Sequence, residues 1–213
     1  MPYAAAIKSA GHAPKNLLED IAPSFASAIA TIRRRESEWI LESSSFEPYE
    51  SDEQLYGAAS RIVSQIHNVM ALYMGLYDQP LPIYALLKLT GDDRLVARRM
   101  YASITINVIR PASQPLNPTA SGSLATVALS RAATDPKISE ALSLVGHDAL
   151  TWGRIYDIIE FLGVKNRTIK RTANHYRHLG SPRNSPLPKN PPTLAEASIF
   201  ATDSLKAWIS RRS

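Results

Sequence analysis

Residues 83–109 read IYALLKLTGDDRLVARRMYASITINVI, and this stretch distinguishes an α+β protein from an all-helical one. Its extended apolar half, 83–89, ends at the turn-forming residues Thr90-Gly91-Asp92-Asp93. The chain then returns over 95–109 with alternating apolar and polar side chains, which predicts an antiparallel hairpin with one face buried. The expected buried face of the returning strand carries Val96, Met100, Ala102, Ile104, Ile106 and Val108.

A long helix is predicted directly before this hairpin. Ser51 and Gln54 have the spacing of a capping box, which marks the start of a helix. Pro80 and Pro82 then stop it, because proline cannot continue a helix. Between these ends, apolar residues recur at helical spacing: Leu55, Ala59, Ile62, Ile66, Val69, Met70 and Tyr73.

The chain before residue 46 is expected to contain one helix and one strand. Residues 15–35 are predicted to be helical, with the helix interrupted or begun near Pro23. The run Arg33-Arg34-Arg35 is flanked by acidic residues and is typical of a helix end that faces solvent. Residues 38–46 are predicted to form a short strand.

After the hairpin the chain is expected to be helical, following a linker over 111–123 that is rich in proline and serine. Helices are predicted over about 123–133, 136–146, 151–162, 166–179 and 193–210. The predicted fold class is therefore α+β, with a helix and antiparallel β-hairpin layer over 1–110 and a helical region over 124–213. The two regions can also form one continuous domain.

Two of these helices have clear start signals, and a proline-rich segment lies between them. Thr151 is a predicted N-cap, and Thr193 with Glu196 forms a second capping box. Residues 180–192 include five prolines, which favour polyproline II and predict a stiff strap along the surface.

The composition is typical of a globular protein without a disulfide framework. The 213 residues are 45% hydrophobic and 20% charged, and none is cysteine. Because cysteine-free chains suit a reducing compartment, we expect a cytoplasmic protein, without signal peptide or membrane span. No cofactor or metal is expected, since the sequence lacks a glycine-rich phosphate loop and the H-E-x-x-H zinc motif.

The positive charge is concentrated in one part of the chain. The formal net charge of the whole sequence is +5. Residues 151–189 contain eight basic and two acidic side chains, so this window alone carries a formal charge of +6. Such a concentration favours RNA or another acidic partner.

Residues 166–178 combine the side chains that bind phosphate with those that move protons. At about 100° per residue, a helix places four of them within roughly 60° of one another: Arg167, Arg171, Asn174 and His178. Arginine offers a planar fork for phosphate, and imidazole groups ordinarily titrate near pH 6.5. His175 and Arg177 flank this stripe as further candidate contacts to phosphate or nucleic acid.

Arg171 and His178, with six residues between them, resemble the motif of the HEPN superfamily, in which an arginine precedes a histidine by four to six residues. The resemblance implies a helical bundle that forms a homodimer and cleaves RNA without a metal. His178 would act as general acid/base on the 2′-hydroxyl, and Arg171 would hold the scissile phosphate. The resemblance also implies a role in a bacterial defence or toxin system. Thr172 departs from the asparagine or aspartate that is frequent after the family's arginine.

The C-terminal third as a whole is similar to a group of bacterial proteins without an assigned activity. Three other interpretations of the basic helix stay open. It can be a plain solvated face, or it can dock an acidic partner protein together with the proline-rich strap. Helices 151–162 and 166–179 are joined by a short Gly-Val-Lys turn, which also suits a helix-turn-helix that reads DNA.

Other titratable side chains are expected to be structural. Asp157 and Glu160 lie one turn apart on a polar helix face and are expected to form salt bridges with Arg154 or with the following basic helix. His67 is flanked by apolar residues and is expected at the edge of the core. His147 and Asp148 are expected to cap or satisfy a turn between helices.

Overall fold

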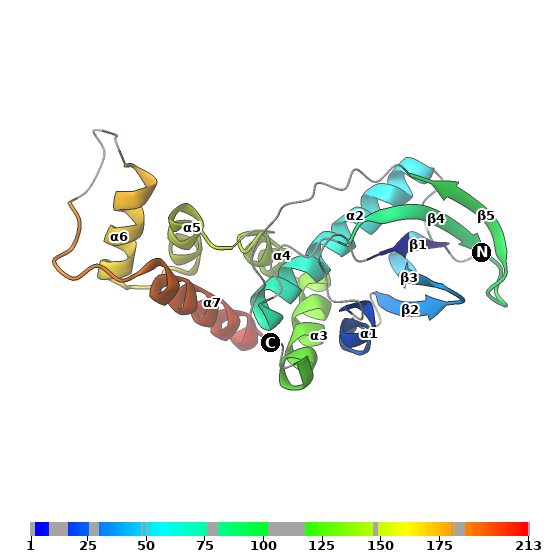
Figure 1. The fold of residues 1–213 in the computed structure, drawn as a ribbon, viewed down its shortest axis with the longest axis horizontal. Helices are drawn as coiled ribbons and strands as arrows, with labels where there is room; N and C mark the ends of the chain where they lie inside the picture. Colours follow the sequence, from blue (N-terminus) through cyan, green and yellow to red (C-terminus); the bar gives the residue numbers. More distant parts are fainter. Residues whose placement is uncertain are drawn as a thin grey trace.

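The computed structural model describes residues 3–8, 17–25, 30–47, 49, 51–75, 81–101, 118–146, 149–179, 181 and 186–212. The protein is α+β, as predicted, with its strands in the N-terminal part and most of its helices after them. The molecule is elongated, with the sheet at one end and the last three helices at the other (Figure 1).

Five strands form one antiparallel sheet in the order β2-β3-β1-β4-β5. They are β1 (Tyr3–Ile7), β2 (Thr31–Arg35), β3 (Glu38–Glu42), β4 (Ile83–Leu89) and β5 (Leu95–Met100). The predicted hairpin is confirmed by the antiparallel pairing of β4 and β5. The strand predicted over 38–46 is confirmed over 38–42 as β3, and it is wrong over 44–46, which form the 3-10 turn η2 (Ser44–Phe46). Residues 102–109 of the predicted returning strand lie outside the described residues.

Residues 31–35 are a strand, so the helix predicted over 15–35 is wrong in its second half. Among the described residues of that range, helical structure is confined to α1 (Leu17–Ile21) and the 3-10 turn η1 (Ala22–Phe25). Ile32 is buried in the main core, and Arg33 on the other face binds two carboxylates. Tertiary packing thus overrides the local helix signal.

The sheet contributes to a different core on each face. The face toward the helices joins the main core through residues that include Ile7, Ile32, Leu41 and Leu86. The opposite face holds a smaller second core of Ala4, Ala6, Ile40, Ala85, Leu87 and Leu89. All six residues of β5 are exposed, so the half-buried returning strand is a wrong prediction for its described part. Within the described part of the chain, β5 is an edge strand and pairs only with β4.

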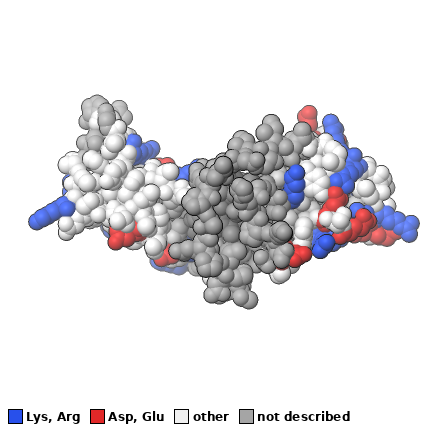
Figure 2. Space-filling model, in the orientation of Figure 1, with Lys and Arg blue, Asp and Glu red and all other residues white. Residues whose placement is uncertain are grey.

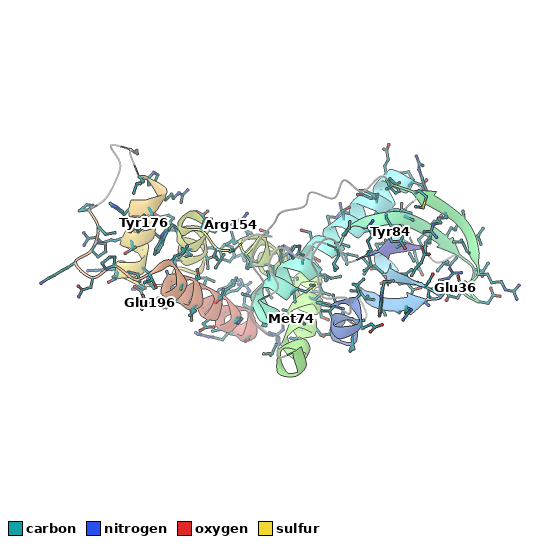
Figure 3. The ribbon with its side chains drawn as sticks, viewed as in Figure 1. Glu36, Met74, Tyr84, Arg154, Tyr176 and Glu196 are labelled. Atoms are coloured by element: carbon teal, nitrogen blue, oxygen red, sulfur yellow. The ribbon has the colours of Figure 1, made fainter. Side chains whose placement is uncertain are left out.

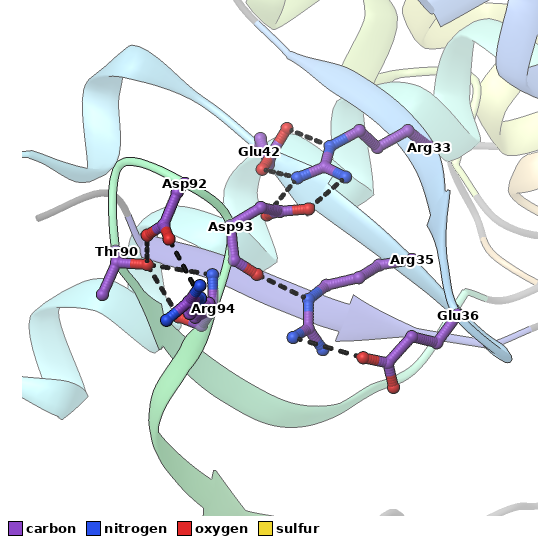
Figure 4. A network of polar contacts seen from close by, with 8 residues as sticks. All are labelled: Arg33, Arg35, Glu36, Glu42, Thr90, Asp92, Asp93 and Arg94. Atoms are coloured by element: carbon purple, nitrogen blue, oxygen red, sulfur yellow. Dashed lines mark hydrogen bonds and ion pairs between the residues drawn. The ribbon is translucent and has the colours of Figure 1, made fainter.

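An ion-pair network on the second face joins the two edges of the sheet (Figure 4). The Arg33 guanidinium of β2 donates to Glu42 at 2.7 Å and to Asp93 at 2.6 Å. Asp93 lies in the β4–β5 turn with a φ of 68°, and its carbonyl accepts from the Arg35 Nε at 3.3 Å. The hydrogen bond from Arg33 lowers the pKa of Asp93. The hairpin tip is thereby fastened across the sheet to β2.

The long helix α2 (Asp52–Val69) begins where the capping signal predicts. The Ser51 Oγ accepts a hydrogen bond from the Gln54 N–H at 3.2 Å. The helix continues into a π-helical turn, η3 (Met70–Met74), and the seven apolar residues predicted on its inner face are all buried. His67 is only 2% exposed, so it lies inside the core rather than at its edge.

The remaining helices are α3 (Pro118–Thr134), α4 (Pro136–Ser143), α5 (Trp152–Leu162), α6 (Arg167–Arg177) and α7 (Leu194–Arg211). α3 begins inside the segment expected to be a linker, because proline is favourable in the first turn of a helix. The Thr151 cap and the Thr193–Glu196 capping box are both confirmed. In the described part of the chain, no helix is both long and apolar enough to cross a membrane.

Two arginines fasten the C-terminal helices to the rest of the chain. Arg154 of α5, labelled in Figure 3, donates from Nη1 to the Leu144 carbonyl at 3.2 Å. Its guanidinium lies over Gly146, where a Cβ would overlap it and where φ is 69°. Arg131 of α3 donates from Nη1 to the Ile209 carbonyl of α7 at 2.9 Å. These contacts join α5 to the residue after α4 and α7 to α3, and α6 packs against α5.

Candidate functional site

α6 presents the candidate residues to solvent because its opposite face is buried. The Asn166 Oδ1 caps the helix by accepting a hydrogen bond from the Ile169 N–H at 3.1 Å. The buried residues of α6 are Ile169, Thr172 and Ala173. Tyr176, labelled in Figure 3, stacks on Trp152 of α5 with ring centroids 5.0 Å apart. These contacts fix the rotation of α6 about its axis.

The exposed face of α6 borders a pocket of about 320 Å³. Its lining residues are Tyr156, Arg167, Lys170, Arg171 and Asn174. Three of them, Arg167, Arg171 and Asn174, belong to the stripe that helical spacing predicts. The structure therefore brings these three together around one concave surface.

Carboxylates of α5 neutralise two other cations of α6. Lys170 is ion-paired with Glu160, and this hydrogen bond raises the pKa of Lys170. Arg177 binds Asp157 with an Nη1–Oδ1 distance of 2.9 Å. The expectation that Asp157 and Glu160 form salt bridges with the basic helix is thus confirmed.

Tyr156 holds these same two cations in place. The Lys170 Nζ lies 5.8 Å and the Arg177 Cζ 5.0 Å from the centroid of its ring. Both distances are within the range of cation–π attraction. The Tyr156 ring and Lys170 line the pocket, and the ring is also in contact with the Arg177 guanidinium.

The other two cations of the pocket have different surroundings. Among the described residues, neither Arg167 nor Arg171 has a carboxylate partner. Arg171 is exposed and donates from Nη2 to the Pro186 carbonyl of the strap at 3.4 Å. Arg167 is exposed at the first position of α6. All five N–H donors of Arg167 and the four that Arg171 does not direct at Pro186 can therefore bind an incoming anion.

The remaining predicted site residues lie around the pocket rather than in its lining. His175 makes a T-shaped contact with the Tyr176 ring at 5.2 Å. His178 is the C-cap of α6, half-buried, and its N–H donates to the Asn174 carbonyl at 3.2 Å. Because α6 rises about 1.5 Å per residue, the backbones of Arg171 and His178 are separated by about 10 Å along its axis.

The sequence did not predict Tyr156 or Lys170 as residues of the site, and it did not predict the ion-pair network around Arg33. Tyr156 has the spacing of an inward-facing residue of its helix, and it is half-buried, so only part of its ring reaches the pocket. Lys170 follows Arg167 by three residues, and this spacing could have placed it on the same face. The Arg33 network depends on residues up to 60 positions apart, which local patterns do not reveal.

The described residues contain no group of three or more His, Asp or Glu side chains arranged to hold a metal ion. The predicted pair His147 and Asp148 lies outside the described residues. Comparison with protein-family models, curated proteins and solved structures found no match.

Proposed function

We propose that the α6 pocket binds the phosphate groups of RNA or of a nucleotide. The observation that carries this proposal is the pair Arg167 and Arg171, which line one pocket without a carboxylate partner among the described residues. Guanidinium groups bind phosphate through two parallel hydrogen bonds. Asn174 and the edge of Tyr156 add a polar group and an aromatic ring, which suit a nucleobase or ribose.

The size and surroundings of the pocket favour a single-stranded or small ligand over duplex DNA. Its volume of about 320 Å³ is near the lower limit for small-molecule sites. A helix that reads DNA must place its exposed side chains in the major groove without other protein segments in the way. On α6, the exposed Arg171 side chain instead contacts the Pro186 carbonyl of the strap. The absence of cysteine from the sequence further supports a role in the reducing cytoplasm.

A binding titration with a fluorescently labelled single-stranded RNA tests this proposal. The Arg171→Ala variant should bind about tenfold or more weakly, because one charge-assisted contact to phosphate is lost. Arg211→Ala is the matched control, since it removes an exposed arginine at the far end of α7. Equal affinities of the wild type and Arg171→Ala would contradict the proposal, provided that both proteins unfold at the same temperature.

We infer RNA cleavage as a second candidate function, because His178 follows Asn174 by one turn on the same side of α6. The 2′-oxygen would attack phosphorus while His178 accepts its proton, and the bond from phosphorus to the 5′-oxygen would break. The leaving 5′-oxygen would take a proton from the protonated His178 or from water, which leaves a 2′,3′-cyclic phosphate. A homodimer would be needed, since about 10 Å of helix separates Arg171 from His178 within one chain.

Cleavage and binding are separated by one further variant. His178→Ala should abolish RNA cleavage and leave RNA affinity within about twofold of the wild type, because histidine is assigned to proton transfer only. Product analysis by gel electrophoresis measures the first quantity, and the titration measures the second. Cleavage by His178→Ala at the wild-type rate would show that His178 is not the acid/base. No cleavage by the wild type would contradict the nuclease and leave the binding proposal standing.

A further inference from the structure

We infer that the ligand of the α6 pocket carries two adjacent phosphoryl groups, one for Arg167 and one for Arg171. This inference rests on the proposed phosphate binding and specifies the chemistry of the ligand. It follows from the spacing, pairing and charge of the cations around the pocket.

Arg167 and Arg171 are spaced to bind two neighbouring anions. They are four residues apart on α6, which puts their backbones one turn and about 6 Å apart along the same face. Both side chains line the one pocket. A guanidinium fork binds one phosphoryl group in a bidentate manner, so two forks side by side match two such groups.

Two other cations of α6 are paired with carboxylates, so the charges of Arg167 and Arg171 are the two that a ligand can neutralise. Lys170 lines the pocket as well, but its charge is compensated by Glu160, and its ammonium lies near the Tyr156 ring. Arg177 is compensated by Asp157. A ligand with one phosphoryl group would leave one guanidinium of the remaining pair without an anion.

A hydrogen bond to the protein orients the Arg171 side chain before a ligand binds. One of the two N–H groups of its Nη2 donates to the Pro186 carbonyl, which leaves one bidentate edge of the guanidinium, Nε/Nη2 or Nη1/Nη2, for a phosphoryl group. Preorganisation of this kind lowers the entropic cost of binding. The Pro186 carbonyl thereby forms part of the site as a support for Arg171.

Two ligand sources offer adjacent phosphoryl groups: the diphosphate of a nucleotide, and consecutive phosphates of an RNA strand. Three adenine ligands separate the possibilities: AMP, ADP and the dinucleotide pApA. Adenine is the base in all three, and pApA adds a second nucleoside together with its second phosphoryl group. The arginine variants therefore show whether a difference in affinity comes from the phosphoryl groups.

Isothermal titration calorimetry on the full chain is the test. We expect ADP or pApA to bind about tenfold or more tightly than AMP, because a second charge-assisted contact forms. Tighter binding of ADP identifies a diphosphate ligand, and tighter binding of pApA identifies an RNA strand. Arg167→Ala and Arg171→Ala should each reduce the preferred ligand to the affinity of AMP, and Arg211→Ala should leave all affinities unchanged.

The outcomes distinguish this inference from the proposed function. Equal affinities for all three ligands, with Arg171→Ala weakening each of them, would overturn the inference and keep phosphate binding. Binding of none of the ligands, together with no binding of single-stranded RNA, would overturn both. Thermal unfolding curves of the variants show whether each one is folded.

Discussion

At the scale of single residues, carboxylate pairing distinguishes a structural arginine from a candidate binding residue. Arg33 donates to Glu42 and Asp93 through four of its five N–H groups, so its guanidinium is mostly used within the protein. Arg167 and Arg171 lack such partners among the described residues and line a pocket. The sequence shows all three as exposed basic residues, and only the structure separates their roles.

The Arg33–Asp93 pair makes stability depend on acid pH. Asp93 has a lowered pKa because Arg33 donates to it. Its stabilising contribution is therefore full above the unfolded-state pKa of about 3.9 and is lost as pH falls through the lower folded-state value. Asp93→Asn should cost about 1 kcal/mol at about pH 6 and progressively less as pH falls below the unfolded-state value of about 3.9, measured by urea unfolding.

Asparagine is the informative substitution at residue 93, because it tolerates the positive φ of that position and removes only the charge. Asp92→Asn is the matched control, since Asp92 pairs with Arg94 while their side chains are 62% and 83% exposed. We expect its cost to stay below about 0.5 kcal/mol. A pH-independent cost for Asp93→Asn would contradict the ion-pair account.

At the scale of elements, the sequence predicts helices with strong local signals and misses strands that depend on distant partners. α2 and α7 were predictable because caps and apolar periodicity agree over 18 residues in each. β1 was missed because Ala4-Ala5-Ala6 favours no strand, although these residues fill the narrow space between the two cores. Residues 31–35 were predicted as helix, because local patterns do not show the partners that hold β2 in the sheet. Those partners include Glu42 of β3 and Asp93 of the β4–β5 turn, which bind Arg33.

The candidate site was predictable to a similar extent. Arg167, Arg171 and Asn174 follow from a spacing of 100° per residue, because α6 is a regular helix. Arg177 was expected to contact phosphate, but it is paired with Asp157. This pairing could not be predicted from the sequence, because it depends on how α5 packs against α6. Helical spacing locates a face, and the neighbouring helix determines which of its charges are compensated.

The joint between α4 and α5 gives a prediction at this scale. Gly146→Ala should destabilise the protein because a Cβ there meets positive φ and also displaces the Arg154 guanidinium from the Leu144 carbonyl. Gly163→Ala is the matched control, since Gly163 also has positive φ but open space around it. We expect about 1 kcal/mol more destabilisation for Gly146→Ala in urea unfolding.

A double variant completes this test. Arg154→Ala removes the group that the new Cβ displaces, so the extra cost of Gly146→Ala should disappear in the Arg154→Ala background. Equal costs for Gly146→Ala and Gly163→Ala in the wild-type background would show that Arg154 does not hold this joint.

At the scale of the whole molecule, the two ends differ in how they use charge. Over the sheet end, on the right in Figure 2, basic and acidic side chains are interspersed, in keeping with the ion pairs of Arg33, Arg98 and Arg99. The other end carries α6 and its pocket (Figure 1). We therefore expect a polyanion to bind at the α6 end, while the sheet serves to build the fold.

The salt dependence of RNA affinity tests this central claim most directly, because each phosphate contact contributes about 0.7 to the slope of log K against log salt for a single strand. We predict that Arg167→Ala/Arg171→Ala lowers the magnitude of that slope by about 1.4 relative to the wild type, and that Arg211→Ala leaves it unchanged. Parallel lines for the wild type and the double variant would contradict the account, since RNA would then be held elsewhere on the protein.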